Sequence, residues 1–222
     1  MAAEQEIPVT NKDKERILNY AREKFCSEGF YKTSMDELAK EMQISKKTIY
    51  KYYTSKENLV EEIVHTNICM DDSVMSEIID SNDNVVLKLL KMSNSHLSKS
   101  AKISEKWIRD VQTQTPHIYE QIRKFKAQKI ESAMIKLISQ GVKEELIEKI
   151  HPQIVILIMT TVASGVTRSE FLINNNISLH DALKAMFEFV FNGLLTPKGR
   201  EIFQKEKKNF NRSIQETLIS KQ

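Results

Sequence analysis

The sequence predicts an all-α protein, and three observations support that prediction. The 222 residues include only five glycines and four prolines, whereas strands joined by tight hairpin turns need both residues more often. Apolar residues recur at intervals of three and four positions, which is the spacing of one helix face. Ser, Thr or Asn stands just before several of these amphipathic stretches, where a helix N-cap is expected.

The first predicted helix covers residues 12–28. Ile17, Ala21 and Phe25 recur four positions apart and form one apolar stripe along it. Gly29 follows, and glycine is the usual residue where a helix ends in a left-handed conformation. We therefore expect this helix to bury one face and to end in a turn at the glycine.

Two short helices are predicted next. The second helix begins at Thr33 or Ser34, because Ser34 and Glu37 have the spacing of a capping box. The third begins after Ser45, a second candidate N-cap, only a few residues beyond the end of the second. The sequence therefore predicts two short helices joined by a turn of three or four residues.

A long fourth helix starts after Thr54 or Ser55, and six further helices are predicted beyond residue 80. Pro116 and Pro152 fit helix starts, where a missing N–H costs nothing, and Gly141 fits a helix stop. The six helices are expected at about 83–99, 103–113, 117–140, 152–173, 179–194 and 198–220.

The third helix has two unlike faces. At about 100° per residue, Ile49 and Tyr53 fall on one side, where they can join a small core. Lys47, Tyr50 and Lys51 fall on the other side. The outward face is therefore predicted to be basic and to carry an aromatic hydroxyl.

Charge is concentrated on this element. Residues 46–56 contain four lysines and no acid, although the formal charge of the whole chain is only +3. Two short helices joined by a tight turn have the helix-turn-helix geometry, in which the second helix enters the major groove of DNA. A solvated lysine face on an ordinary surface helix is the plain alternative, and spacing alone leaves both readings open.

The segment from Ile17 to Ile63, ILNYAREKFCSEGFYKTSMDELAKEMQISKKTIYKYYTSKENLVEEI, resembles the tetracycline-repressor (TetR/AcrR) family of bacterial transcription regulators. The match is long and ordered, and it covers about 50 residues; the rest of the chain matches in helical character and length. The elements that carry it are Gly29–Phe30, Thr33–Asp36, Leu38–Ala39, Ser45–Lys46, Thr48–Tyr50, Tyr52–Tyr53, Ser55–Glu57 and Leu59.

Two positions depart from the family pattern. Gln43 stands in the turn before the third helix, where the family commonly has glycine. If that position needs a positive φ, glutamine costs roughly 1 kcal/mol there. Lys47 replaces a residue that is frequently small, and it adds a long donor to the groove face that can alter base preference.

The resemblance implies an N-terminal three-helix DNA-binding head over residues 10–70 and a helical effector-binding and dimerisation domain over residues 71–222. Within the head, the lysines and Thr48 near the start of the third helix are expected at base edges or nearby phosphates, and the remaining groups at the DNA backbone. The expected contacts with double-stranded DNA are Thr33, Ser34, Ser45, Lys46, Lys47, Thr48, Tyr50, Lys51, Tyr52 and Lys56.

The resemblance also implies a homodimer and a small-molecule effector. A four-helix bundle built from residues 152–173 and 179–194 of each subunit is the expected dimer contact. Its apolar candidates are Ile154, Leu157, Ile158, Val162, Leu183, Met186, Phe187 and Val190, although the core of one subunit must claim some of them. An unknown apolar or amphipathic effector is expected in a pocket near Met92, His96, Trp107, Phe125, Met134 and Phe171. Methionines and aromatics at helical spacing are also the ordinary contents of a core.

Other classes of function find little support. The chain has no glycine-rich phosphate loop, no nucleophile motif and no His or Cys pair at metal-ligand spacing, so we expect no catalytic residues, metal or cofactor. The two cysteines predict no disulfide framework. The longest apolar run, Ile154–Met159, is too short to span a bilayer, and the N-terminus lacks the pattern of a signal peptide, so a cytoplasmic regulator, most simply a repressor, is expected. The alternative is a helical interaction module whose head binds a protein partner.

Overall fold

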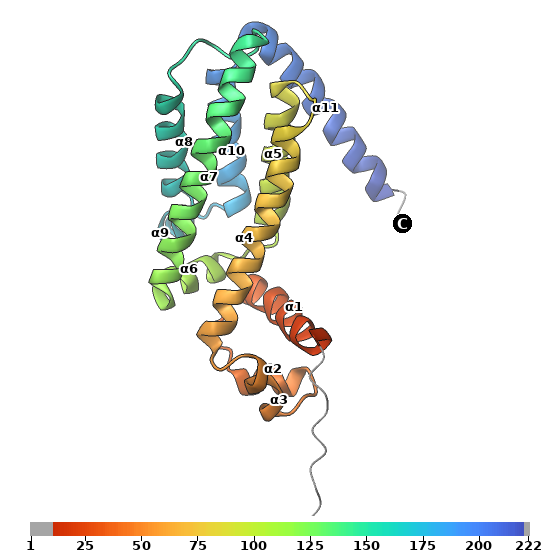
Figure 1. The fold of residues 1–222 in the computed structure, drawn as a ribbon, viewed down its shortest axis with the longest axis vertical. Helices are drawn as coiled ribbons and strands as arrows, with labels where there is room; N and C mark the ends of the chain where they lie inside the picture. The colour runs from red at the N-terminus through yellow and green to blue at the C-terminus, as the bar shows by residue number, and fades with distance from the viewer. Residues whose placement is uncertain (1–10, 220–222) are drawn as a thin grey trace, which may run out of the picture.

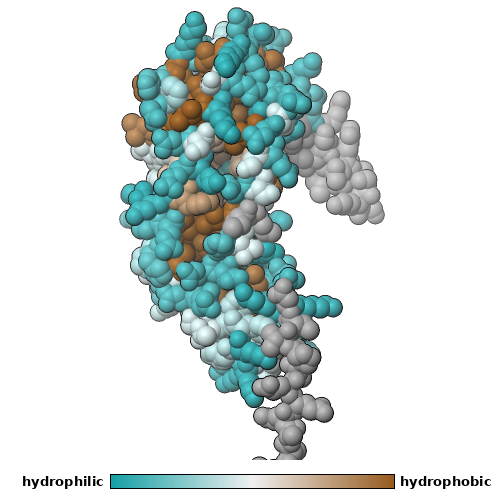
Figure 2. Space-filling model, in the orientation of Figure 1, coloured by the Kyte–Doolittle hydropathy of each residue, from teal (hydrophilic) through white to brown (hydrophobic). Residues whose placement is uncertain are grey.

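The computed structural model describes residues 11–219, with side chains described for residues 12–68 and 72–209. Residues 11–219 fold into eleven α-helices and contain no strand, so the prediction of an all-α protein is confirmed. A small head lies at one end of an elongated molecule, and a bundle of longer helices forms the body (Figure 1). On the face drawn in Figure 2, hydrophobic residues reach the surface mainly over the body, whereas the head is mostly hydrophilic.

The head contains three helices and the start of a fourth. They are α1 (Asn11–Glu28), α2 (Met35–Glu41), α3 (Lys46–Tyr52) and α4 (Lys56–Asp80). Each of the three later helices begins after a serine whose side chain accepts a backbone N–H from the first turn: Ser34, Ser45 and Ser55. Ser34 and Glu37 form the full capping box that their spacing predicts.

Two turns in the head have left-handed backbone. Gly29 ends α1 with φ of +81°, as expected for a glycine at that position. Gln43, in the turn between α2 and α3, has φ of 56°, so a non-glycine residue does occupy a positive-φ position there. The turn is held by main-chain bonds, since the Ile44 N–H donates to the Ala39 carbonyl at 2.9 Å.

The body contains the remaining helices. They are α5 (Val85–Ser100), α6 (Glu105–Gln114), α7 (Pro116–Lys143), α8 (Pro152–Val166), α9 (Ser169–Asn175), α10 (Leu179–Leu194) and α11 (Pro197–Ile219). α5, α7, α8 and α10 run along the long axis beside the upper part of α4, and α6 lies across the junction with the head (Figure 1). The predicted bounds are close except at two places.

The single helix predicted over 152–173 is wrong, because α8 and α9 are separate helices bent by 62°. The break occurs after Thr167, whose N–H and hydroxyl both donate to the Ala163 carbonyl, at 3.1 and 2.8 Å, and Arg168 then has extended backbone. The stop predicted at Gly141 is also wrong, because α7 continues to Lys143. A Cβ at Gly141 would lie 2.5 Å from the Ile147 side chain, so the glycine serves close packing.

Apolar side chains form two main cores. The head core contains Phe25, Leu38, Ile49 and Tyr53, which is the small core that the helix periodicity predicts. The body core lies among α5, α7, α8, α10 and the start of α11. The head core also includes Trp107, Val111 and Ile118, which come from α6 and α7. Packing therefore crosses the division proposed between residues 10–70 and 71–222, and that division remains a prediction.

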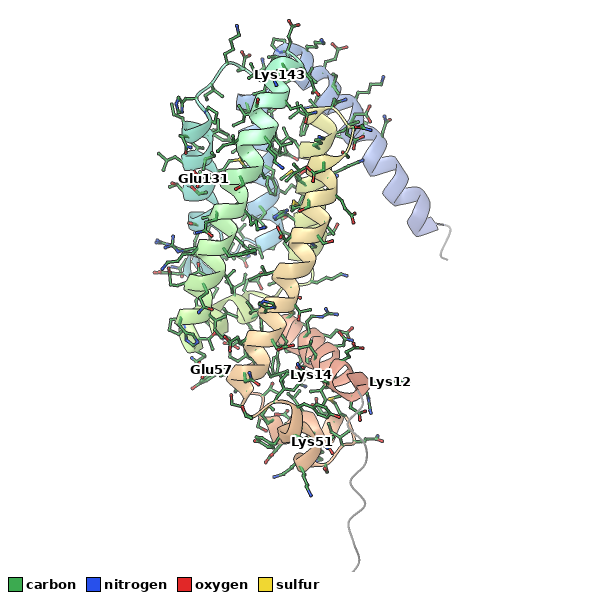
Figure 3. All side chains as sticks on the ribbon, viewed as in Figure 1. Lys12, Lys14, Lys51, Glu57, Glu131 and Lys143 are labelled. Atoms are coloured by element: carbon green, nitrogen blue, oxygen red, sulfur yellow. The ribbon has the colours of Figure 1, made fainter. Side chains whose placement is uncertain are left out.

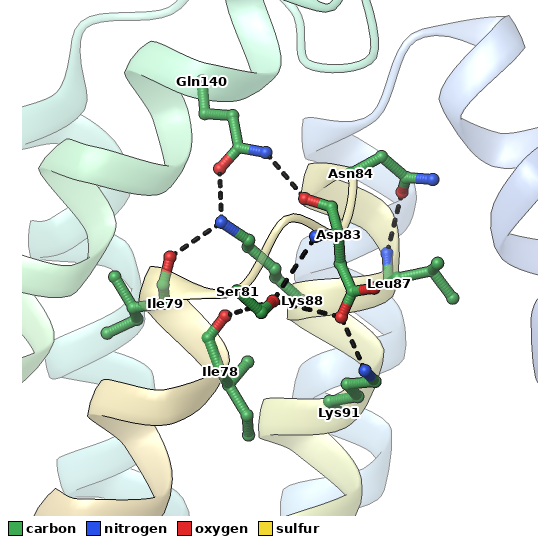
Figure 4. A network of polar contacts seen from close by, with 9 residues as sticks. All are labelled: Ile78, Ile79, Ser81, Asp83, Asn84, Leu87, Lys88, Lys91 and Gln140. Atoms are coloured by element: carbon green, nitrogen blue, oxygen red, sulfur yellow. Dashed lines mark hydrogen bonds and ion pairs between the residues drawn. The ribbon is translucent and has the colours of Figure 1, made fainter.

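The end of α4 far from the head is fixed by a polar network around Lys88 (Figure 4). Lys88 is only 4% exposed, and its ammonium donates to the Ile79 carbonyl at 2.7 Å and to Gln140 Oε1 at 2.9 Å. The Gln140 amide in turn donates to the Asp83 carbonyl at 2.9 Å. These bonds satisfy a buried charge and join the α4–α5 turn to α7.

Within the residues that the structure describes, no single helix is both long and apolar enough to cross a bilayer. The bent pair α8 and α9 reaches the required length and apolar composition only when the two helices are taken together.

Candidate nucleic-acid interface

The outer face of α3 is exposed and basic. Ile49 is fully buried and Tyr53 nearly so, which turns Lys47, Tyr50 and Lys51 outward. Tyr50 is 45% exposed. Figure 3 labels Lys51 on α3, at the end of the molecule opposite the start of α11. The helix-wheel prediction for these five residues is therefore confirmed.

The first turn of α3 is ordered by short polar side chains. Ser45 Oγ accepts the Thr48 N–H at 3.0 Å, and the two hydroxyls are 2.8 Å apart. Ser45 is exposed and Thr48 is half-buried. These contacts fix the orientation of the turn that also carries Lys46 and Lys47.

Lys46 pairs with an acid that the sequence reasoning missed. Its ammonium bonds Asp36 Oδ2 on α2, and this bond raises the pKa of Lys46. Asp36 therefore places a negative charge on the proposed DNA face, next to one of its lysines. Asp36 and Lys46 are ten residues apart and on different helices, so only the helix-turn-helix geometry itself could have indicated the pair.

Lys56 does not lie where the sequence suggested. Its ammonium is partly buried and donates three bonds, to the carbonyls of Phe30, Tyr31 and Thr33, at 2.9, 3.1 and 3.0 Å. Burial lowers the pKa of Lys56. An ammonium has only three donors, so in this geometry the group binds the chain's own turn and has no donor left for a phosphate.

The other expected contacts in the head differ in accessibility. Ser34 is exposed at the start of α2, whereas Thr33 is buried beside it. Tyr52 is half-buried, and burial together with the neighbouring Asp13 carboxylate raises its pKa. Tyr53 is in the core, as expected, and burial raises the pKa of its hydroxyl to about 12. Ser34 is thus presented to a partner and Thr33 is not.

Four of the eight predicted dimer residues are exposed on α8, and they recur at helical spacing. They are Ile154, Leu157, Ile158 and Val162. Leu157 is 65% exposed, which is unusual for a leucine on a helix of this apolar composition. On α10, Leu183 and Phe187 are partly buried against the body core, and Met186 and Val190 are buried within it. The expectation for these last two is corrected, because they belong to the core of the subunit.

Phe189, on α10, was missed by the sequence reasoning. It is 82% exposed, the most exposed large apolar side chain in the described part of the chain. Its neighbours Met186 and Val190 both face the core, so the helix turns Phe189 outward. α10 packs beside α8, and these two helices therefore carry the apolar stripe defined here as Ile154, Leu157, Ile158, Val162 and Phe189.

The six predicted pocket residues are not brought together. Trp107 packs in the head core, with its ring 5.5 Å from that of Phe30, and Met134 is buried in the body core. Met92 and His96 lie on α5, where the His96 ring is 6.1 Å from that of Phe187. Phe125 lies on α7, 5.4 Å from the Lys129 ammonium. One effector site lined by all six is therefore not formed here.

Phe171 belongs to an open groove instead. It lies at the corner between α8 and α9, and the groove faces solvent. The residues that line it are Val162, Gly165, Val166, Arg168, Glu170, Phe171, Asn174 and Asn175.

Among the described residues, no group of three or more His, Cys, Asp or Glu side chains is placed to hold a metal ion. Cys26 is buried, and burial raises the pKa of its thiol to about 11, which disfavours the reactive thiolate. The side chain of Cys69 lies outside the described residues.

Residues 17–63 match the family model described as bacterial regulatory proteins, tetR family. Over 49 residues the chain is 45% identical to the HTH-type transcriptional regulator UidR of Escherichia coli (strain K12). That match covers 22% of this chain and 25% of UidR, so the chain spans about a quarter of the curated relative it matches.

Solved structures share the fold over most of the chain. A TetR-family transcriptional regulator from Marinobacter aquaeolei VT8 has a TM-score of 0.67 at 15% identity, with 91% of this chain and 99% of that one covered. A putative transcriptional regulator from Saccharomonospora viridis, in complex with choline, has a TM-score of 0.64 at 13% identity and coverages of 84% and 100%.

A regulator of the TetR/AcrR family from Thermobifida fusca YX-ER1 has a TM-score of 0.61 at 18% identity, with coverages of 82% and 98%. The matched family and these similar proteins are described as regulators, not as enzymes. Residues 17–63 thus match the N-terminal domain of the tetR family of bacterial regulatory proteins, and the chain as a whole shares the fold of these solved regulators.

Proposed function

We propose that the protein is a DNA-binding transcriptional regulator that binds a palindromic operator as a homodimer. The observation that carries this proposal is the outer face of α3, where Lys47, Tyr50 and Lys51 are exposed above a buried Ile49. A short helix with this face fits the major groove, and lysine there prefers the O6 and N7 acceptors of guanine.

The apolar stripe on α8 and α10 supports the homodimer in this proposal. The apolar stripe on α8 and α10 leaves large apolar side chains in water within one protomer, and a second copy covers them if the two stripes meet about a twofold axis. Two heads fixed in this way read two half-sites about one helical turn apart or modestly more. The head over residues 10–70 and the body over residues 71–222 remain the proposed functional units.

Control by a small molecule is the third part of the proposal. The regulator from Saccharomonospora viridis with a similar fold is described as a complex with choline, and this chain is proposed to respond to an apolar or amphipathic effector. Such a ligand releases the operator only if its affinity is higher for the protein conformation that cannot bind DNA than for the conformation that can. Repression relieved by the effector is the simplest regulatory outcome.

A gel shift with the DNA upstream of the protein's own gene, at graded salt, tests the proposal. If a dimer neutralises about eight phosphates, affinity falls by about four orders of magnitude between roughly 50 and 200 mM salt. If the upstream DNA contains no palindrome, an operator sequence is obtained by selecting, from a random library, the duplexes that bind the full chain. Absent or salt-independent binding favours the alternative, a head that binds a protein partner.

Lys47→Ala is expected to relax base preference. Lys47 is exposed on the groove face of α3, and one good base contact contributes about 1–3 kcal/mol of discrimination. Binding of the altered protein to the selected palindrome and to a scrambled duplex should therefore converge, as measured by fluorescence anisotropy. Equal losses on both duplexes contradict a reading role for Lys47.

Asp36→Asn is expected to strengthen binding to every duplex. The change removes a negative charge from the proposed DNA face and releases Lys46 from its ion pair. The salt slope should steepen by about 0.9 per head, the value for one more phosphate neutralised. An unchanged affinity with an unchanged slope in anisotropy titrations at several salt concentrations would show that this pair lies off the interface.

A further inference from the structure

The turn between α1 and α2 is bound by a carboxylate from the body. Asp110, on α6, is 5% exposed, and its Oδ2 accepts the N–H of Phe30 at 2.7 Å and that of Tyr31 at 2.8 Å. The partners of these bonds lie 80 and 79 residues apart in the sequence. A charged acceptor makes such bonds roughly twice as strong as a neutral one.

Lys56 binds the same turn. As described above, the ammonium at the start of α4 donates to the carbonyls of Phe30, Tyr31 and Thr33. Asp110 thus accepts hydrogen bonds from N–H groups of the turn, and Lys56 donates hydrogen bonds to its carbonyl groups. The two opposite charges therefore bind the backbone of one turn, and this arrangement is called here the turn clamp.

Gly29 makes room for the clamp. A Cβ built on Gly29 would lie 2.6 Å from Asp110 Oδ2, which is closer than a real Cβ approaches an oxygen. The φ of +81° independently favours glycine at this position. Any larger residue would have to displace the carboxylate from the two N–H groups that it binds.

α6 itself is held at both ends. Near its start, the Ser104 N–H donates to the Cys26 carbonyl of α1 at 2.8 Å. Near its end, Gln112 Oε1 accepts the Ser169 hydroxyl at 2.6 Å, at the corner between α8 and α9. Between these points Trp107 packs on Phe30. The position of the turn is therefore set by the body, through a helix that is not part of the helix-turn-helix.

We propose that Asp110 is a positioning residue for DNA binding, and that it acts with Lys56 through the turn clamp to place Ser34 and α2 relative to α3. Thr33 and Ser34 follow the clamped turn directly, and Ser34 caps α2, against which α3 packs. This inference rests on the proposed function, because it concerns how the head is set for DNA.

For Asp110, the proposal predicts a change in DNA affinity opposite in direction to the change that its charge alone would cause. Removing a negative charge from a DNA-binding protein strengthens binding if charge alone acts. Removing this one is expected to weaken binding instead, because the turn is released. Asp110→Asn keeps the shape of the side chain, and a neutral amide accepts the two bonds less strongly than a carboxylate.

The test compares Asp110→Asn with the matched control Asp80→Asn in the full chain, on a palindrome selected from random duplexes and on a scrambled duplex. Asp80 is exposed at the far end of α4, and its Oδ1 lies 3.7 Å from the Lys136 ammonium. We expect Asp110→Asn to weaken binding of the palindrome about tenfold, with little change on the scrambled duplex, because the charge-assisted bonds to the turn are weakened. Asp80→Asn should stay within about twofold on both.

Lys56→Gln provides an independent second variant. The turn clamp predicts the same selective loss on the palindrome, whereas a direct phosphate contact predicts an equal loss on both duplexes. Circular dichroism establishes that each variant is folded at the assay temperature. If a residue only stabilises the fold, its replacement lowers binding to both duplexes equally, in proportion to the loss of folded protein.

The outcomes separate the two proposals. If the unaltered protein binds the palindrome and Asp110→Asn matches Asp80→Asn, the positioning role is wrong while the proposed function stands. Equal losses on both duplexes for Asp110→Asn also overturn the positioning role. If the unaltered protein binds neither duplex, the proposed function fails, and the positioning role fails with it.

Discussion

A protein that carries aspartate at both Leu157 and Phe189 is expected to be a monomer. The two side chains are 65% and 82% exposed, so the change costs little within one protomer. In a symmetric dimer each replacement occurs twice, and uncompensated buried charges cost several kcal/mol each. Dimerisation should therefore weaken by at least about a thousandfold. Sedimentation velocity at micromolar protein measures the change.

Ile135→Asp is the matched control for this experiment. Ile135 is also an exposed apolar residue, but it lies on α7 and outside the apolar stripe. The Ile135→Asp variant should have the same sedimentation coefficient as the unaltered protein. If the double variant sediments like the unaltered dimer, α8 and α10 do not form the dimer interface. Loss of palindrome binding with retained weak binding to a single half-site is the expected consequence for DNA.

Trp107→Ala is expected to be the most destabilising single change at the junction of head and body. Trp107 is 7% exposed and packs edge-on against Phe30, within a core that joins α6 to the head. Removing a buried tryptophan of this kind costs about 3–5 kcal/mol, because apolar burial is reduced and a cavity is left behind. Urea unfolding followed by circular dichroism measures this as a lower midpoint.

Tyr31→Ala is the control for the tryptophan variant. Tyr31 is an aromatic residue of the same turn, next to Phe30, but it is exposed. Its removal should change the free energy of unfolding by about 0.5 kcal/mol or less. If Trp107→Ala costs no more than Tyr31→Ala, then α6 does not share a core with the head, and the turn clamp loses its support.

Local signals made the head predictable from sequence. Ser34 with Glu37 and Ser45 before Lys46 are caps whose partners lie within three residues, so their spacing determines where α2 and α3 begin. Ile49 and Tyr53 show the buried side of α3 by helical periodicity alone. Such features depend on the nearest helical turn and need no knowledge of the rest of the fold.

Interactions between distant segments were not predictable in the same way. Lys56 was expected at a phosphate, because a lysine at a helix start is ordinarily exposed, and its three carbonyl partners lie 23 to 26 residues earlier. Asp110 gave no signal at all, since a lone acid on an amphipathic helix is ordinarily solvated. The packing of α6 across the junction brings Asp110 to the turn that Lys56 binds from the start of α4.

The body was the least predictable part for a related reason. α8 and α10 are apolar on more than one side, so periodicity could not separate Leu157 and Phe189, which are exposed, from Met186 and Val190, which are buried. The proposed pocket rested on residue type without position, and Trp107 and Met134 proved to fill two different cores. Both the exposed residues of α8 and α10 and the positions of the predicted pocket residues depend on which neighbours bury each side chain.

The most direct test of the central claim is the salt dependence of binding between the full chain and its selected palindrome. The unaltered protein is predicted to give a slope of log affinity against log salt of about −7, and replacing Lys46, Lys47 and Lys51 with glutamine should reduce its magnitude by about 0.9 for each phosphate that is no longer neutralised. A slope near zero, or the same slope with all three lysines replaced, would contradict the account.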